Sequence, residues 1–163
     1  DRETFAACKP LLDLLAERTF YVGPSGHGSR IKLATNLVLG LNRLVLAEGL
    51  AFAECLGLDL GVFLEVLKAG PAYSAAMAVK GEKMLRSDFT AESRVRQHRK
   101  DVAIILKHAN ELKQELPLSR VHLAILESAI AAGDGDLDTS AVIRQIKRMT
   151  KCSDGHRRKD QRL

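Results

Sequence analysis

The chain has 163 residues, of which 46% are hydrophobic and 28% are charged, and its formal net charge at pH 7 is +5. A chain of this length is the size of one domain with a sizeable core, and only 4% aromatic residues and no tryptophan predict that this core is aliphatic. No uninterrupted apolar run reaches the roughly 20 residues of a membrane span, and the first ten residues lack the basic start and apolar centre of an export signal.

The positive charge is concentrated at the C-terminal end. From Arg144 onward the sequence contains eight Lys or Arg and two Asp, a net charge of +6, so the rest of the chain is close to neutral at −1. A basic tail can contact phosphate groups nonspecifically, but a solvated terminus is the favoured interpretation. We therefore expect no specific nucleic-acid partner and no membrane partner.

The three cysteines, Cys8, Cys55 and Cys152, are far apart and odd in number. Their spacing predicts neither a disulfide framework nor a metal site. A reducing cytoplasm is the simplest setting for such a chain, so we expect a cytoplasmic protein.

Apolar residues at helical spacing predict a first helix over Glu3–Glu17, although Pro10 weakens the pattern in its first half. The next segment, "RTFYVG", is typical of a short strand at Thr19–Val22, which Gly23 and Pro24 would end. One strand cannot form a sheet. We therefore expect these residues to be the end of a larger domain, or to pair with another chain.

A long helix is predicted from about Gly28 to Leu56. It is apolar on nearly every side, so we expect it to be buried centrally with other helices around it. No further strand is predicted, and the body is therefore all-α from residue 25 onward. The remaining helices are expected at Leu60–Lys68 after an Asp59 cap, within residues 72–89, from about Ala91 to Leu112, from a Ser119 cap to Gly133, and after a cap at Asp138 or Ser140.

Three polar side chains of the long helix share one face. Successive helix residues turn by about 100°, which places Lys32, Asn36 and Arg43 within about 40° of one another. The glycines Gly26 and Gly28 allow close backbone approach at the helix start, where free N–H groups beside Lys32 would form an anion-binding corner. The pattern alone leaves open that Lys32 simply reaches water near the helix end.

A second candidate is the pair Lys100–Asp101 in "QHRKDVAIIL". Adjacent helix residues do not face each other, so the pattern by itself favours ordinary surface charge. The neighbouring His98 is typical of a structural or solvent-exposed histidine. No metal ligands are predicted.

The segment "GPSGHGSRIKLATN", residues 23–36, fits the pattern G-x-x-G-x-G-x-x-x-K-x-x-x-N without a gap. In this motif the chain resembles the β-hydroxyacid dehydrogenases, a group that includes 3-hydroxyisobutyrate dehydrogenase and tartronate semialdehyde reductase, and it is similar to the C-terminal domain of 6-phosphogluconate dehydrogenase. The resemblance continues through "AEGLAFAECLGLD", "KGEKMLRSDFTAESRVRQHRKDVAIIL", "LPL" and "GDLDTSAVI", so it covers about residues 1–149. Arg99 departs from the pattern, because the family usually has an apolar residue there.

The resemblance implies roles for the candidate residues. Lys32 would act as general acid and base at the substrate carbonyl while NAD or NADP exchanges a hydride, and Asn36 would hydrogen-bond the substrate. Gly26 and Gly28 would lie near the substrate carboxylate, and Lys100 would reach the cofactor. Such chemistry suits a lysine, because reduction builds alkoxide charge that a nearby ammonium stabilises. The substrate would be a small hydroxyacid or its aldehyde.

The resemblance also implies a division into domains. Residues 1–23 would be the remnant helix and strand of a missing Rossmann domain, 24–150 an all-α substrate and dimerisation domain, and 151–163 a basic tail. We expect a helical bundle around the long helix, a homodimer, and no activity from the isolated chain. The alternative is a non-catalytic self-association or interaction module with a basic tail, and the intact Lys32–Asn36 pair argues against it.

Overall fold

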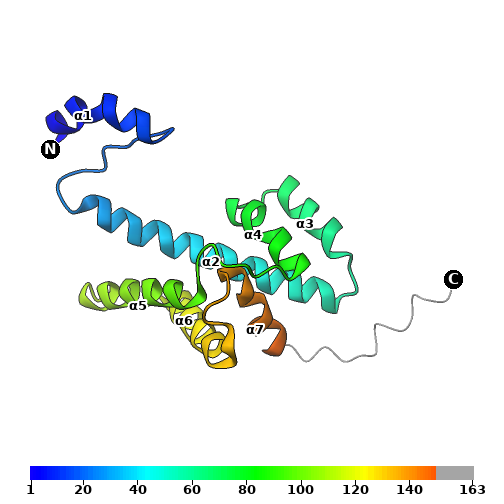
Figure 1. The fold of residues 1–163 in the computed structure, drawn as a ribbon. Coiled ribbons are helices and arrows are strands. Elements are labelled where there is room, and N and C mark those ends of the chain that lie inside the picture. The colour runs from blue at the N-terminus through cyan, green and yellow to red at the C-terminus, as the bar shows by residue number, and fades with distance from the viewer. Residues whose placement is uncertain (150–163) are drawn as a thin grey trace, which may run out of the picture. The chain divides into compact units, whose positions relative to one another are not determined.

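The computed structural model describes residues 1–149, and the regular structure in this range is helical (Figure 1). The prediction of an all-α body is therefore confirmed. The described residues form two compact units that divide between Asn36 and Leu37, so the boundary lies inside the second helix. The elements are α1 (Arg2–Leu15), α2 (His27–Cys55), α3 (Leu60–Ala69), α4 (Ala75–Arg86), α5 (Val95–Glu111), α6 (Pro117–Ala129), the π-helical turn η1 (Ile130–Asp134), the 3-10 turn η2 (Thr139–Ala141) and α7 (Val142–Met149).

The first unit contains α1, which begins where the Asp1 carboxylate accepts a hydrogen bond from the backbone N–H of Thr4 at 2.7 Å. The strand expected at Thr19–Val22 does not form in the part of the chain that the structure describes. A strand needs a neighbour to accept and donate its ladder hydrogen bonds, and this segment has none there. It is instead held by side chains, because the ring of Tyr21 lies 5.6 Å from that of Phe5 in α1.

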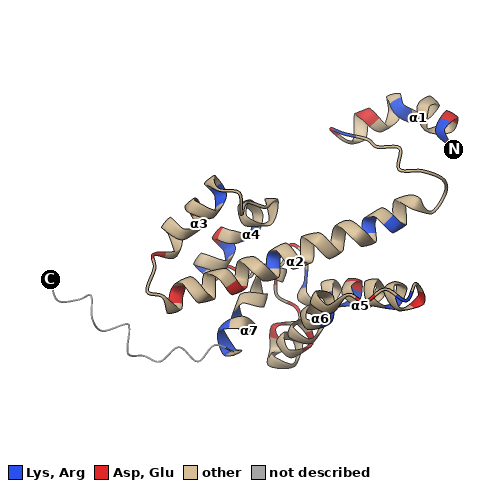
Figure 2. Ribbon diagram, turned by 180° about the vertical axis from the view of Figure 1, so that it is seen from behind, with Lys and Arg blue, Asp and Glu red and all other residues tan. Residues whose placement is uncertain are grey.

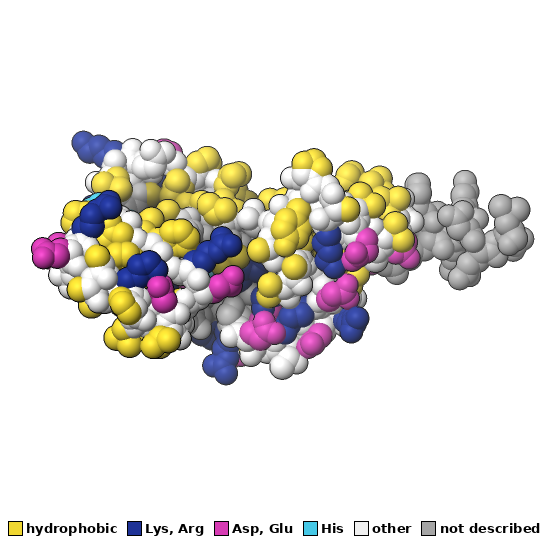
Figure 3. All heavy atoms as spheres, turned by 90° about the horizontal axis from the view of Figure 1, so that it is seen from above, with side chains coloured by type: hydrophobic (Ala, Val, Ile, Leu, Met, Phe, Trp, Pro, Cys, Tyr) yellow, Lys and Arg dark blue, Asp and Glu magenta, His cyan; other side chains and the backbone are white. Residues whose placement is uncertain are grey.

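The long helix α2 forms almost where it was expected, but the prediction that it is buried all round is wrong for the described chain. Its buried residues begin only at Gly40. Large apolar side chains remain exposed along the rest of its surface, and Figure 3 shows one face of the molecule on which hydrophobic side chains are widely exposed. By length and composition alone α2 could also cross a membrane, a test that core helices of soluble proteins pass too.

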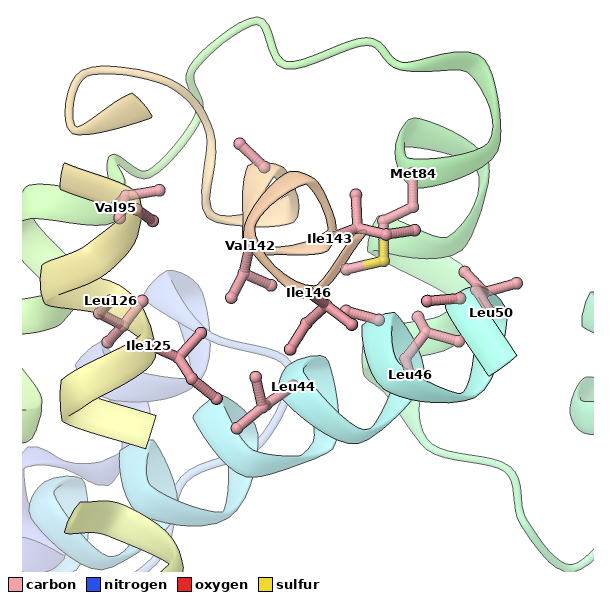
Figure 4. Close-up of a cluster of buried hydrophobic side chains, with 14 of the residues drawn as sticks. Leu44, Leu46, Leu50, Met84, Val95, Ile125, Leu126, Val142, Ile143 and Ile146 are labelled. Atoms are coloured by element: carbon pink, nitrogen blue, oxygen red, sulfur yellow. The ribbon is translucent and has the colours of Figure 1, made fainter. Parts of the chain in front are cut away.

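The core of the second unit lies between α2 and the last helix (Figure 4). Val142 and Ile146 of α7 point toward Leu44 of α2, and all three are more than nine-tenths buried. Leu64 from α3 is fully buried and lies so close to α4 that a Cβ added at Gly81 would sit 2.7 Å from its Cδ1. The core is thus aliphatic, as the composition predicts.

A buried carboxylate, Asp138, fixes the loop between α4 and α5. Its Oδ2 accepts hydrogen bonds from the backbone N–H groups of Glu92 at 3.1 Å and Ser93 at 3.2 Å, and from Lys80 Nζ at 3.0 Å. Its Oδ1 accepts from Ser140, which makes Asp138 the N-cap of η2. These contacts hold the loop in a non-helical path, so α5 begins at Val95 and not near Ala91 as expected.

The expected start of the next helix also needs correction. Ser119 does not cap it, because α6 already begins at Pro117, whose fixed φ suits a first helical position. Ser119 is therefore an internal, buried residue. The helix was expected to stop at Gly133, but α6 ends at Ala129 and passes into η1, inside which Gly133 breaks the helical backbone with a φ of 90° that L residues rarely adopt.

Two cysteines lie in the described range. Cys8 is free and exposed, whereas Cys55 is disulfide-bonded, which the spacing of the cysteines did not predict. The expected basic tail, 151–163, lies outside the described residues.

Burial alone would raise the pKa of the Asp138 carboxyl, but hydrogen bonds from Ser140 and Lys80 outweigh burial and hold this pKa well below its usual value. We predict that Asp138→Ala lowers the free energy of unfolding by about 3–5 kcal/mol, because the backbone N–H groups of Glu92, Ser93 and Ser140 lose their acceptor and Lys80 keeps only its ion pair with the exposed Glu92. Urea denaturation followed by circular dichroism measures the change.

The control for this prediction is Asp136→Ala, which removes an exposed carboxylate that pairs with Arg96 at 3.2 Å. Exposed ion pairs contribute little to stability, so this variant should unfold close to the wild-type midpoint. Equal losses in the two variants would contradict the role assigned to Asp138.

Candidate functional site

The glycine-rich entry to α2 contains two glycines with positive φ. Gly26 has a φ of 88° and Gly23 a φ of 118°, conformations that a side chain would strain. A Cβ added at Gly26 or at Gly28 would meet no atom within 4 Å, so the backbone here faces open space. His27 closes the turn, since its backbone N–H donates to the Pro24 carbonyl at 3.0 Å.

The start of α2 keeps unsatisfied donors. The N–H groups of Gly28 and Ser29 donate to no backbone carbonyl of the described chain, as geometry dictates for the first turn of a helix. Lys32 follows one turn later with an exposed side chain and no ion-pair partner among the described residues. Free N–H groups and a full positive charge on one end of a helix favour an anion.

Asn36 lies one turn beyond Lys32 on the same face of α2 and is half-buried. The basic positions of α2 lie in its first half and its middle, and the acidic ones toward its end (Figure 2). The structure therefore places the predicted substrate residues Gly26, Gly28, Lys32 and Asn36 on the first part of one continuous helix and its entry turn.

Lys100 belongs to the second unit, where it lines a surface cleft at the start of α5. Two of its basic neighbours in the cleft are neutralised: Arg96 pairs with Asp136 at 3.2 Å, and Arg99 with Glu127 at 2.7 Å. The unexpected Arg99 thus forms a surface ion pair and does not disturb the helix. Lys100 forms no ion pair with the described residues and remains available to a ligand.

A buried polar cluster lies deeper in the second unit, where α2, α5 and α6 meet. It consists of Arg43 from α2, His98 from α5 and His122 from α6, each more than nine-tenths buried. The two imidazole rings lie 5.1 Å apart between centroids. Gly40 makes the contact possible, because a Cβ at this position would come within 2.6 Å of His98 Nε2.

The cluster holds one positive charge without a bonded partner. Arg43 Nε and His98 Nε2 are buried without a hydrogen-bond partner, which costs free energy. Burial lowers the pKa of His98 to about 3, with the nearby Arg43 charge acting in the same direction. Burial and Arg43 likewise lower the pKa of His122 to about 4. Both imidazoles are therefore neutral at pH 7.

Only part of this cluster is predictable from the sequence. The helical face shared with Lys32 indicated Arg43, but no pattern separates a buried histidine from an exposed one, and His122 sits in an ordinary amphipathic helix. Contacts between residues far apart in the sequence bring the three together. Among residues 1–149, no three or more His, Cys, Asp or Glu side chains are grouped so as to hold a metal ion.

Comparison with known proteins identifies relatives of the chain. The family described as "NAD-binding of NADP-dependent 3-hydroxyisobutyrate dehydrogenase" matches residues 26–146. Glyoxylate/succinic semialdehyde reductase 2 of Arabidopsis thaliana is 29% identical over 147 residues, which are 90% of this chain and 41% of the relative. 2-Hydroxy-3-oxopropionate reductase of Escherichia coli is 30% identical over 149 residues, 91% of this chain and 51% of that protein.

A solved structure, that of 3-hydroxyisobutyrate dehydrogenase from Salmonella typhimurium, matches with a TM-score of 0.81 and 30% identity, covering 86% of this chain and 50% of that one. The chain therefore spans about half the length of the relatives it matches.

We predict that Gly40→Ala destabilises the protein by about 1–3 kcal/mol, because the new methyl group overpacks a well-filled contact between α2 and the two histidines. Gly28→Ala is the matched control, since it also lies in α2 but has no neighbour within 4 Å. Thermal unfolding measures both. If Gly40→Ala had the same melting temperature as Gly28→Ala, α2 would not approach the histidines of α5 and α6 this closely.

Proposed function

This chain belongs to the family of NAD-binding domains of NADP-dependent 3-hydroxyisobutyrate dehydrogenases, and we propose that it is the substrate and dimerisation domain of an NAD(P)-dependent oxidoreductase. The reaction is the interconversion of a small β-hydroxyacid and its aldehyde or keto form. The observation that carries the proposal is Lys32, an unpaired lysine one turn inside a helix whose glycine-rich start has free N–H groups.

The residues at the start of α2 suit a substrate that carries a carboxylate beside its reacting carbon. The carboxylate fits the corner formed by Gly26, Gly28 and the free N–H groups of the first helical turn. Asn36 supplies a neutral hydrogen-bonding group on the face that also carries Lys32. Lys32 is then the group that meets the substrate oxygen.

Lys32 performs the proton transfer in this reaction. The nicotinamide, when bound, supplies the hydride to the carbonyl carbon in reduction. As negative charge grows on the carbonyl oxygen, the Lys32 ammonium stabilises it and donates a proton from Nζ, so the product is the neutral hydroxyl. In the oxidative direction neutral Lys32 accepts this proton. Solvent restores the protonation state of the lysine, which is exposed.

Lys100 is the cofactor-binding residue of this proposal. It lies exposed in the cleft at the start of α5, and its neighbours Arg96 and Arg99 are engaged with carboxylates. A free ammonium there fits an anionic or carbonyl group of NAD or NADP. The pyrophosphate itself needs the glycine loop and helix start of a Rossmann fold. We therefore propose that a dinucleotide-binding domain works with this chain and that residues 1–149 alone reduce no substrate.

The exposed apolar side of α2 supports self-association. Val38, Val45 and Phe52 are 55–64% exposed and recur every seven residues. Seven residues make almost two full turns, so these side chains form one stripe along the helix. Burying such a stripe against a second copy of the chain removes apolar surface from water, and we propose a homodimer that uses it.

We predict that Lys32→Ala lowers kcat by about 100-fold or more in a polypeptide that carries this chain with its dinucleotide-binding domain, because the proton donor and its charge are lost. Folding should be unchanged, since the side chain is exposed. Steady-state kinetics with a small hydroxyacid and NAD or NADP provide the measurement.

The matched control is Arg30→Ala, which removes another exposed cation from the first turns of α2 and should leave kcat within a few-fold of wild type. Near-normal turnover of Lys32→Ala would reject the catalytic assignment and favour a non-catalytic interaction module.

We also predict that Phe52→Glu weakens self-association, because a charge placed within the apolar stripe has to be desolvated on dimer formation. Analytical ultracentrifugation should show a dimer for the wild type at micromolar concentration and a monomer for the variant. Val121→Glu serves as control, because Val121 is 57% exposed, lies on α6 and is not part of the stripe. A monomeric wild type would refute the dimer.

A further inference from the structure

The cluster of Arg43, His98 and His122 has no role in the proposed reaction, and its composition is unusual for a packed interior. α2 contributes a guanidinium, and α5 and α6 each contribute an imidazole, at the level where Gly40 lets the three helices approach. All three residues of the cluster belong to the second unit, whereas Gly26, Gly28, Lys32 and Asn36 belong to the first.

The cluster is arranged to tolerate one positive charge but not three. The charged groups that act on it are Arg43 itself, the half-buried Asp101 of α5, and Asp138 at the start of η2. Neither carboxylate forms an ion pair with Arg43 or a histidine, and Asp138 is engaged by Lys80 and by the loop before α5. No carboxylate of the described residues is therefore in ion-pair contact with either imidazole.

We propose that Arg43, His98 and His122 form an acid-sensitive latch that holds α2 against α5 and α6 near neutral pH and releases them in mildly acidic solution. The close packing at Gly40 keeps water from the rings while they are neutral. A proton on either ring adds a second buried positive charge beside Arg43, and the rings can be hydrated only if the helices separate. Acid thus favours the open state.

The direction and size of the pH dependence of opening follow from the number of protons that the closed and open states bind. In the closed state burial lowers the pKa of both histidines to about 3 and about 4, whereas an open chain has the ordinary value near 6.5. The open state therefore binds more protons between about pH 6.5 and pH 4, and stability falls as pH falls through this range. From pH 7 to pH 5 the opening equilibrium constant rises roughly 25-fold for each histidine and roughly 600-fold for both.

The test compares unfolding equilibrium constants at pH 7 and pH 5, from urea titrations, in the wild type and in the double variant His98→Gln, His122→Gln. Glutamine fills similar space and does not titrate. The carboxylates titrate in both proteins. Dividing the pH-induced change in the unfolding constant of the wild type by that of the variant therefore leaves the contribution of the two histidines. From pH 7 to pH 5, we expect the unfolding equilibrium constant of the wild type to rise several-hundred-fold more than that of the double variant. An equal pH dependence in the two proteins overturns the proposal.

His108→Gln is the matched control, because His108 is an exposed histidine on the same helix α5 that contacts Glu111 at 3.1 Å. It should retain nearly the wild-type pH dependence. If the double variant does not fold, the ring resonances of wild-type His98 and His122, followed by NMR, decide the matter. Rings that stay neutral down to the pH at which the protein opens support the latch, and rings that titrate near pH 6.5 in the folded protein refute it.

Discussion

The buried carboxylate of Asp138 is the interaction on which the second unit depends. It has no solvent exposure, yet it accepts hydrogen bonds from α4, from the loop before α5 and from the start of η2. Each partner comes from a different part of the sequence. Removing a charge from water is costly unless it is fully bonded, so these segments can assemble only in the arrangement that satisfies it. Asp138 therefore sets where α5 begins and where the turn before α7 lies.

The position of α5 matters for both polar features of the second unit. Its start carries Lys100 in the surface cleft, and its inner face carries His98 against Gly40 of α2. The Asp138 contacts that end the preceding loop thus position a group exposed to ligands and a group excluded from water on the same helix. A cleft residue and a buried residue two positions apart differ so strongly in environment because side chains of a helix diverge by about 100° per residue.

The helix α2 combines three surfaces along its length. Its glycine-rich start faces solvent with free N–H groups and Lys32, one side from Gly40 onward packs into the aliphatic core, and the opposite side presents the apolar stripe of Val38, Val45 and Phe52. Such a helix is apolar all round by composition, although only one side is covered by its own chain. Under the proposed function, the start of the helix serves substrate binding and the apolar stripe serves self-association, while the side opposite the stripe forms part of the core.

The sequence by itself determined the all-α class, the near-limits of α2 and α3, the Asp59 cap and the lysine–asparagine face, because periodicity and caps are local properties of the chain. It also contained the motif from Gly23 to Asn36 without interruption. The tertiary structure decided what depends on distant partners. Residues 19–22 do not form a strand, because no neighbouring strand is present in the described chain. The hydrogen bonds to Asp138 keep the preceding loop non-helical, so α5 begins only at Val95. Arg43 packs beside two histidines from helices more than 50 residues away in the sequence. No local pattern carries that information, since burial and pairing are set by which segments pack together.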